Sequence, residues 1–331
     1  MKRAHGMVDL SRVKTAPLSA RPSLASIKNM AGIPPTAGAR QFFDSLPGFL
    51  KADDLRGLID SIIAAKRKRK PVIIMAGGHV IKVGLSAVII DLIKEGMVTG
   101  LCLNGAGLIH DCEMALVGRT SEDVAAGLAD GSFGMAQETG EWFASITAYA
   151  DRHDLGLGQA AGAVLNRPKV KYRKHSLLAA CDRYEIPAMV HLAVDTDIVC
   201  QHPQYDPAAA AKASHRDFTA LAYQVSRGEN GGVFINVGSA VILPEVFLKA
   251  LTVSRNIYGR PYRIITANFD MIMQYRPATN VVGRPTARGG TGYNFVGHHE
   301  LMIPLLAWGL RAFAGQRAKP TRKSKSKTKR G

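Results

Sequence analysis

Short loops of glycine and small polar residues recur in this sequence, each directly after an apolar run. Glycine lets a backbone approach a pyrophosphate closely, and small side chains leave room for a ribose and a base. Neither GxGxxG nor GxxxxGKS/T occurs, so the sequence contains no standard phosphate-binding fingerprint. If the loops meet in space, they predict a site for one extended nucleotide; they are Gly77-Gly78-His79, Asn104-Gly105-Ala106-Gly107, Asp195-Thr196-Asp197, Gly238-Ser239 and Thr266-Ala267-Asn268.

His110 and Asp111 begin the predicted helix that follows the second of these loops. An imidazole and a carboxylate can exchange protons with a ligand bound beside the loop, so both are candidate catalytic residues. The alternatives are a capping or surface role for His110 and, for Asp111 and Glu113, the favourable interaction of acids with the positive end of a helix.

Histidines, acids and a cysteine also cluster between residues 191 and 202. Their spacing, H-x3-D-x-D-x2-C-x-H, matches no standard zinc signature, so we expect no metal site there. The sequence has four cysteines and no CxxC pair, which is typical of a protein kept in a reducing cytoplasm.

From residue 71 onward, apolar runs of strand length alternate with amphipathic helical segments. Strands buried on both faces and separated by helices indicate a mostly parallel sheet flanked by helices, which is an α/β, Rossmann-like fold. In such a sheet, ligands bind beyond the carboxyl ends of the strands, where these loops would meet. Strands are predicted at 71–76, 98–103, 186–194, 232–237 and 262–267, and helices at 52–65, 85–96, 176–184, 207–227, 244–256 and 300–313.

The formal net charge of +17 is concentrated in three segments, 1–28, 66–70 and 311–331. Together they hold a net charge of +19, so the remainder carries about −2 and lacks the basicity of a nucleic-acid-binding fold. The extreme C-terminus has no apolar residues to pack, and we expect disorder with at most weak contact to RNA or another polyanion. The predicted organisation is an arm over the body or a neighbouring subunit (1–40), a single α/β domain (41–314) and a basic tail (315–331).

No apolar stretch approaches the roughly 20 residues of a membrane-spanning helix, and the N-terminus lacks the pattern of a secretory signal. We therefore expect no membrane contact and a cytoplasmic location.

Deoxyhypusine synthases begin their dinucleotide-binding part with a segment that resembles MAGGHVIKVGLSAVIIDLIKEGMVTGLCLNGAGLIHD (75–111). The resemblance extends over roughly residues 70–310 and implies the NAD-binding fold of that family, NAD as cofactor and a homo-oligomer. It makes Asp195 and His298 cofactor contacts and places Glu300 beside the substrate. The other similar segments are EIPAMVHLAVDTDI (185–198), GVFINVGSAVILPEVFLKA (232–250), YRIITANFD (262–270) and HHELMIPLL (298–306).

The sequence departs from that family at its reactive lysine. The corresponding segment, RPTARGGTGYNFVGHHE (284–300), contains no lysine, and neither arginine nor histidine can form the imine with an aminobutyl group. Ile109-His110 replaces an acid pair, and residues 238–245 lack a histidine pair. The pattern NxAxxHDxE (104–113) is also similar to ornithine cyclodeaminases. Both families use NAD to convert an amine carbon to an imine.

A glycine-rich segment, 276–297, is predicted to be a mobile surface loop or a lid over the substrate. Its arginines, among them Arg284 and Arg288, suit a carboxylate or phosphate group of the substrate better than a polycationic amine.

The sequence thus predicts an NAD-dependent enzyme that oxidises a small amine or amino acid to an imine, with aminobutyl transfer as the first named activity. The alternatives are an NAD-dependent amino-acid deaminase or cyclodeaminase, and a non-catalytic nucleotide-binding scaffold whose basic tails contact RNA.

Overall fold

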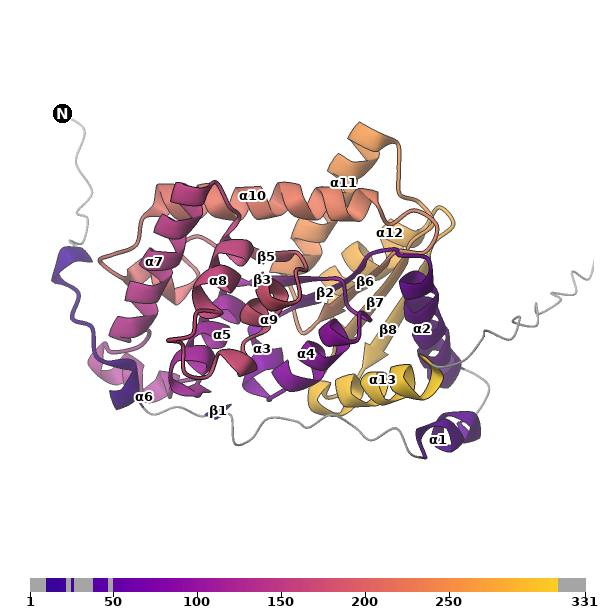
Figure 1. Cartoon of the computed structure of the whole chain (residues 1–331), viewed down its shortest axis with the longest axis horizontal. Helices are drawn as coiled ribbons and strands as arrows, with labels where there is room; N and C mark the ends of the chain where they lie inside the picture. Colours follow the sequence, from indigo (N-terminus) through magenta and orange to yellow (C-terminus); the bar gives the residue numbers. More distant parts are fainter. Residues whose placement is uncertain (1–9, 22–24, 27–37, 47–49, 315–331) are drawn as a thin grey trace, which may run out of the picture.

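The computed structural model describes residues 10–21, 25–26, 38–46 and 50–314. Its centre is a parallel six-stranded sheet with the order β5-β3-β2-β6-β7-β8, so the chain moves outward from β2 in one direction and then returns to continue from β6 in the other (Figure 1). This α/β, Rossmann-like sheet confirms the predicted fold class. The strands are β2 (Val72–Ala76), β3 (Gly100–Asn104), β5 (Ala188–His191), β6 (Val233–Val237), β7 (Ile265–Asp270) and β8 (Thr291–Val296).

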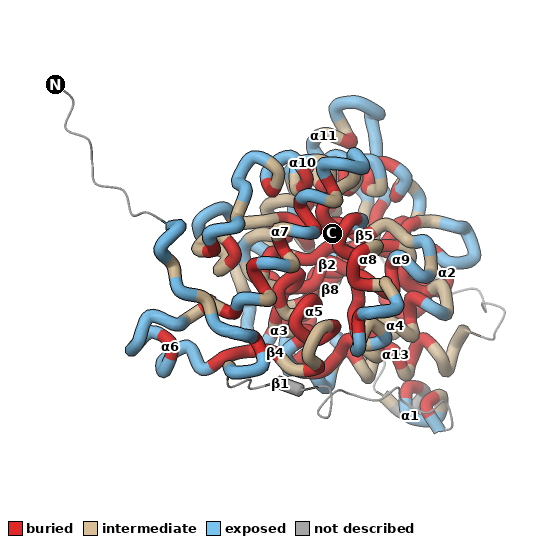
Figure 2. Tube along the Cα trace, turned by 60° about the vertical axis from the view of Figure 1, so that its left-hand side comes forward, coloured by how far each residue is buried: buried red, intermediate tan, exposed pale blue. Residues whose placement is uncertain are grey.

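Helices cover both faces of the sheet because alternate residues of its central strands point to opposite sides. Ile73 and Met75 of β2 pack with the α10 and α11 side chains, whereas Ile74 and Ala76 belong to the larger cluster on the other face. Figure 2 shows this buried centre surrounded by an exposed rim. The helices are α1 (Ala39–Ser45), α2 (Leu50–Arg67), α3 (Gly78–Lys82), α4 (Ser86–Lys94), α5 (Gly105–Val117), α6 (Val124–Asp130), α7 (Gln137–His153), α8 (Leu157–Leu165), α9 (Leu177–Arg183), α10 (Pro207–Ser226), α11 (Ile242–Tyr258), α12 (Arg284–Thr286) and α13 (His299–Ala314).

Side chains of the long helix α10 form hydrogen bonds with the backbone at the edge strand β5. The Asp217 carboxylate accepts hydrogen bonds from the backbone N–H groups of Val190 (2.7 Å) and Gly158 (2.8 Å), and the Ser214 hydroxyl accepts one from Leu192 (3.1 Å). Burial raises the pKa of Asp217 to about 7, and these hydrogen bonds oppose the shift. A buried carboxylate thus joins an edge strand, a helix N-terminus and α10.

The described part of the N-terminal arm lies against the body. Leu18 is fully buried, and the Ala16 N–H donates to the carbonyl of Met135 (2.8 Å). A two-residue strand, β1 (Ala25–Ser26), pairs antiparallel with β4 (Arg119–Thr120). The expectations for residues 1–9 and for the tail 315–331 lie outside the described residues.

The prediction of a loop at 276–297 is wrong, because this segment forms regular secondary structure. It forms a π-helical turn, η6 (Pro277–Gly283), then α12, and then the edge strand β8. Only Phe295 of β8 is buried, so its sequence lacks the continuous apolar run that marks the central strands. No helix in the described ranges is long and apolar enough to cross a membrane.

Candidate functional site

Two glycine turns meet where the strand order reverses. Gly77 follows β2 and Gly238 follows β6, and a Cβ atom on Gly77 would overlap the carbonyl oxygen of Gly238. The Gly77 N–H donates to the carbonyl of Val237 (2.9 Å), and Gly238 has a φ of +63°. Any side chain at Gly77 would push these turns apart. The crevice beyond such a reversal is the usual ligand site of an open parallel sheet.

The loops after β3 and β5 also touch. The Asn104 side chain caps α5 by accepting a hydrogen bond from the Gly107 N–H (2.9 Å). A Cβ on Gly105 would overlap the Asp197 carboxylate, which accepts a hydrogen bond from the Ala193 N–H (2.8 Å). Four strand ends therefore bring their loops into one region, as the sequence predicted for Gly77–Gly78, Gly105 and Gly238.

His110 lies on the first turns of α5 and faces this region. Its Cδ2 atom would lie 2.9 Å from a Cβ on Gly78, and its Nδ1 atom is 2.7 Å from the Thr120 hydroxyl. Burial lowers the pKa of His110 to about 4; Glu113 opposes this shift, and the positive charges of Lys82 and Arg21 add to it. His110 is therefore neutral at pH 7 and can accept a proton.

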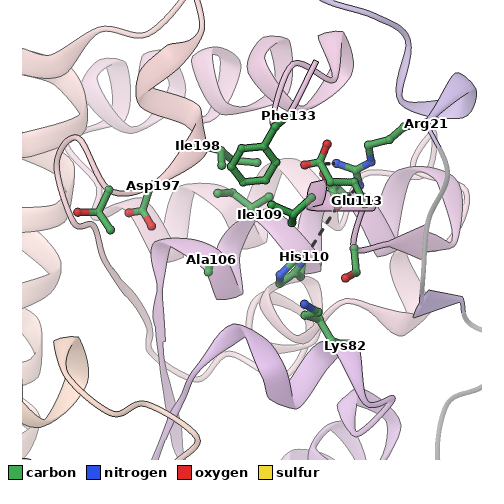
Figure 3. A pocket seen from close by; sticks show the side chains of 13 residues that line it. Arg21, Lys82, Ala106, Ile109, His110, Glu113, Phe133, Asp197 and Ile198 are labelled. Atoms are coloured by element: carbon green, nitrogen blue, oxygen red, sulfur yellow. Dashed lines mark hydrogen bonds and ion pairs between the residues drawn. The ribbon is translucent and has the colours of Figure 1, made fainter. Parts of the chain in front are cut away.

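A cavity of about 200 Å³ opens beside His110 (Figure 3). Figure 3 shows the Lys82 and His110 side chains together at one side of it and Asp197 at another. Its wall combines acidic and basic side chains with apolar ones, so it suits a small ligand that carries charge. The lining residues are Arg21, Lys82, Ala106, Ile109, His110, Glu113, Ser121, Glu122, Val124, Phe133, Thr196, Asp197 and Ile198.

Arg21 brings the N-terminal arm into this cavity. Its guanidinium lies 2.7 Å from Glu113 and 3.3 Å from Glu122, and both carboxylates are buried. Glu113 also accepts hydrogen bonds from the hydroxyls of Thr120 and Thr139. This network attaches the arm to α5 and to the segment after β4. The sequence carries no local signal for Arg21, because its partners lie about a hundred residues away.

Asp111 faces a different direction from its neighbour His110, because adjacent helical residues point about 100° apart. Its carboxylate accepts hydrogen bonds from the Ser176 hydroxyl (2.6 Å) and from the N–H groups of Leu177 (2.7 Å) and Leu178 (3.0 Å). Burial raises the pKa of Asp111 to about 6, against these hydrogen bonds. Asp111 therefore anchors α9, and we leave it out of the candidate catalytic residues.

Two histidines meet on the other side of the glycine turns. The His79 and His299 rings are 5.4 Å apart, and His299 lies against Gly238. His299 is buried, with Nε2 positioned 3.2 Å from the carbonyl of Phe269. Burial, followed by the nearby His299, lowers the pKa of His79. The predicted His298 is 67% exposed and Glu300 is 45% exposed, so neither is buried with this pair.

Three further predicted residues, Asp195, Thr266 and Ala267, lie elsewhere than expected, whereas Ser239 lies where it was expected. Asp195 is exposed, and Asp197 lines the cavity in its place. Thr266 and Ala267 are buried in the first half of β7, which continues to Asp270, so they do not lie in a loop. Ser239 does follow β6, and its hydroxyl accepts a hydrogen bond from the Leu243 N–H (3.2 Å) at the start of α11.

Arg284 and Arg288 are not among the residues that line this cavity. Both precede β8, and the Arg288 guanidinium lies 5.1 Å from the ring of Tyr262, which precedes β7. The Arg284 guanidinium donates to the Asn280 side chain (2.8 Å). The structure therefore does not bring these two arginines together with His110.

The residues at the reversal fit a dinucleotide. The two turns contact each other through backbone atoms and carry no side chains at Gly77 and Gly238, and a short approach to backbone is what a pyrophosphate requires. Two buried polar atoms near the strand ends, His299 Nδ1 and Asp270 Oδ2, have no hydrogen-bond partner within the described ranges. In the same ranges, no three His, Cys, Asp or Glu side chains come together as a metal site.

No protein-family model matches the sequence, and no curated protein is similar enough to match it. Similar folds occur in solved structures. The ternary complex of AgrE with ornithine and NAD+ has a TM-score of 0.51 and 16% identity over 77% of this chain and 32% of AgrE. A conserved LOR/SDH protein from Methanococcus maripaludis S2 has a TM-score of 0.50 and 15% identity over 79% of this chain and 68% of that one.

A structure from Entamoeba histolytica that is named after deoxyhypusine synthase has a TM-score of 0.45. The two chains are 9% identical over 78% of this chain and 87% of the other. The present chain spans about a third of the length of AgrE. The likeness to the AgrE and Methanococcus maripaludis structures, at 15–16% identity, shows a shared Rossmann-like fold.

Proposed function

We propose that NAD binds in the crevice at the strand reversal, with its pyrophosphate over Gly77-Gly78 and Gly238-Ser239. The observation that supports this most strongly is the contact between the Gly77 and Gly238 turns, which leaves no room for a side chain between them. The AgrE complex, whose fold is similar, contains NAD+. NAD supplies a hydride acceptor when it is bound.

We further propose that the cavity beside His110 holds the amino-bearing carbon of a small substrate. The neutral imidazole accepts a proton from the substrate ammonium group, and the carbon of the resulting amine then loses a hydride to the bound acceptor, which leaves a protonated imine. His110 is close to the crevice, because its ring contacts Gly78.

Lys82 favours an amino acid over a polyamine. It lines the cavity, and its ammonium group has no ion-pair or hydrogen-bond partner among the described residues, whereas Arg21 is paired with two glutamates. A free ammonium group beside the substrate attracts a carboxylate and repels a second substrate cation. An NAD-dependent amino-acid deaminase or cyclodeaminase is therefore the function that this geometry supports best.

Aminobutyl transfer stays the second candidate because Lys82 could replace the lysine that is missing from residues 284–300. A Lys82→Arg variant separates the two functions, since arginine can bind a carboxylate but cannot form an imine. Borohydride added with spermidine and NAD should trap no adduct if the substrate is an amino acid. Trapping on Lys82, lost in the variant, would establish aminobutyl transfer instead.

The direct test mixes NAD-loaded protein with amino acids such as ornithine and follows NADH fluorescence. We expect a signal that is lost in His110→Gln and kept in His215→Gln, a control at an exposed histidine of α10. Native mass spectrometry of the same sample would detect bound NAD and the expected homo-oligomer. Bound NAD with no reduction by any amine or amino acid would contradict the reaction while leaving the cofactor site intact.

A further inference from the structure

A second cavity, of about 300 Å³, lies at the opposite end of the sheet from the glycine turns. It opens where three parallel strands begin, since Pro71, Thr99 and Pro187 directly precede β2, β3 and β5. The ends of α2 and α10 form the rest of its wall. The lining residues are Lys66, Arg69, Lys70, Pro71, Gly96, Thr99, Pro187, Gln224 and Arg227.

The charge of this cavity is entirely positive. Lys66, Arg69, Lys70 and Arg227 line it, and no acidic residue does. Lys66 donates to the backbone carbonyl of Glu95 (2.5 Å), which leaves its positive charge unneutralised. The other three cations have no side-chain partner among the described residues.

The acidic residues near these segments in the sequence pair with other residues or line another cavity. Glu95 lies 2.9 Å from Arg311, and Glu229 lies 2.9 Å from Arg263. Glu185, two residues before Pro187, lines a different cavity beside Asp217. Four positive charges therefore face one concave surface, and no described acidic residue lines it.

The backbone at Arg69 is a separate indication that this cluster has a use. Arg69 has a φ of +52°, in the left-handed region that favours glycine, and it occupies the turn that ends α2. The Lys70 N–H donates to the carbonyl of Ala65 (2.9 Å), which closes this turn. Basic residues are favoured at helix ends, but that preference does not require an arginine in a position suited to glycine. A non-glycine residue that persists in a disfavoured conformation commonly marks a functional site.

We propose that this cavity binds a ligand that carries two or more linked phosphate groups. Two guanidinium groups can each bind phosphate oxygens in a bidentate manner, and two ammonium groups add point charges. Linked phosphates match four cations better than one carboxylate does. The ligand is either a free polyphosphate or the backbone of an RNA strand. This site is separate from the crevice and the cavity beside His110, so it does not depend on the proposed enzymatic function.

Isothermal titration of the full-length protein with inorganic tripolyphosphate tests the proposal. We expect Arg69→Gly and Arg227→Gln each to weaken binding about tenfold or more, because each removes a charge-assisted contact. Arg69→Gly should also keep or raise the melting temperature, since glycine relieves the positive φ. Loss of binding in a variant that is no less stable cannot be ascribed to unfolding.

Lys51→Gln is the matched control, because Lys51 lies near the other end of the same helix and pairs with Asp54. It should change tripolyphosphate binding less than twofold. A short single-stranded RNA that competes with tripolyphosphate identifies a nucleic-acid backbone as the source, and the absence of competition identifies a free polyphosphate. Equal affinity in wild type, Arg69→Gly and Arg227→Gln, or an equal loss in Lys51→Gln, would overturn the proposal.

Discussion

Gly77 and Gly238 touch across the point where the strand order of the sheet reverses, so closely that a Cβ on the first would overlap the carbonyl oxygen of the second. This contact joins the ends of the two central strands, β2 and β6. The same atoms therefore serve the packing of the fold and the proposed cofactor site. Substitution here should affect both.

The first prediction concerns Gly77→Ala. The added methyl group meets backbone rather than a flexible side chain, so we expect a loss of about 1–3 kcal/mol in the free energy of unfolding. NAD affinity should also fall, because the turns must separate. Urea unfolding and calorimetry measure the two effects. Gly283→Ala is the control, since Gly283 is exposed and its Cβ would meet only one atom, at 3.3 Å. Unchanged stability of Gly77→Ala would contradict the observed contact.

The central strands could be predicted from sequence because they are continuous apolar runs, and the observed β2, β3 and β6 begin and end within two residues of the predictions. The end of β7 could not be predicted. Asn268 interrupts its apolar pattern, yet it is buried in a row of asparagines, bonded to Asn236 (2.8 Å) and Asn294 (2.7 Å) on the adjacent strands. A polar residue whose hydrogen bonds are made by the adjacent strands cannot be told from a loop residue when only the sequence is known. The sequence therefore predicts Thr266 and Ala267 at a strand end.

The candidate site likewise contains some residues that the sequence could indicate and others that it could not. Glycine at the strand ends is a local signal, and it correctly marked the turns that meet. Which of two nearby residues faces inward depends on how a loop is rotated: His299 is buried where His298 is exposed, and Asp197 lines the cavity where Asp195 is exposed. Arg21 contributes through ion pairs with distant residues, for which a single sequence holds no signal.

The second prediction separates the roles of His110 and Asp111. Asp111→Ala removes three hydrogen bonds at the start of α9, so we expect it to lower the free energy of unfolding by about 2–4 kcal/mol. NAD affinity of the folded fraction should not change. His110→Gln should do the reverse, with melting temperature nearly kept and NADH formation lost. Thermal melts and the fluorescence assay, run on both variants, give the comparison. Loss of NADH formation in a fully folded Asp111 variant would return Asp111 to the catalytic residues.

The third prediction is a pH effect on stability at Asp217. Burial raises the pKa of Asp217 to about 7, so the folded state holds a proton that the unfolded chain releases near its ordinary pKa of 3.8. Stability due to this group is therefore full below about pH 4 and declines as pH rises to about 7. Asp217→Asn cannot ionise, and its melting temperature should depend less on pH in that interval. Asp195→Asn, at an exposed position, should keep the wild-type slope. A wild-type slope in Asp217→Asn would refute the assignment.

The last prediction concerns the pH dependence of catalysis. Burial lowers the pKa of His110 to about 4, against an ordinary value of 6.5, so the imidazole stays neutral through the physiological range. An enzyme whose histidine base had an ordinary pKa would lose activity below about pH 6.5. Here, kcat/KM at a saturating concentration of NAD should stay level down to about pH 5 and fall below that pH.

Lys82 and Arg21 contribute to the low pKa of His110, so Lys82→Gln should move the acidic limb of the pH profile to higher pH. Lys249→Gln, which removes an exposed lysine that pairs with Glu245, should leave the limb in place. An acidic limb near pH 6.5 in the wild-type protein would show that His110 is not the group that accepts the proton.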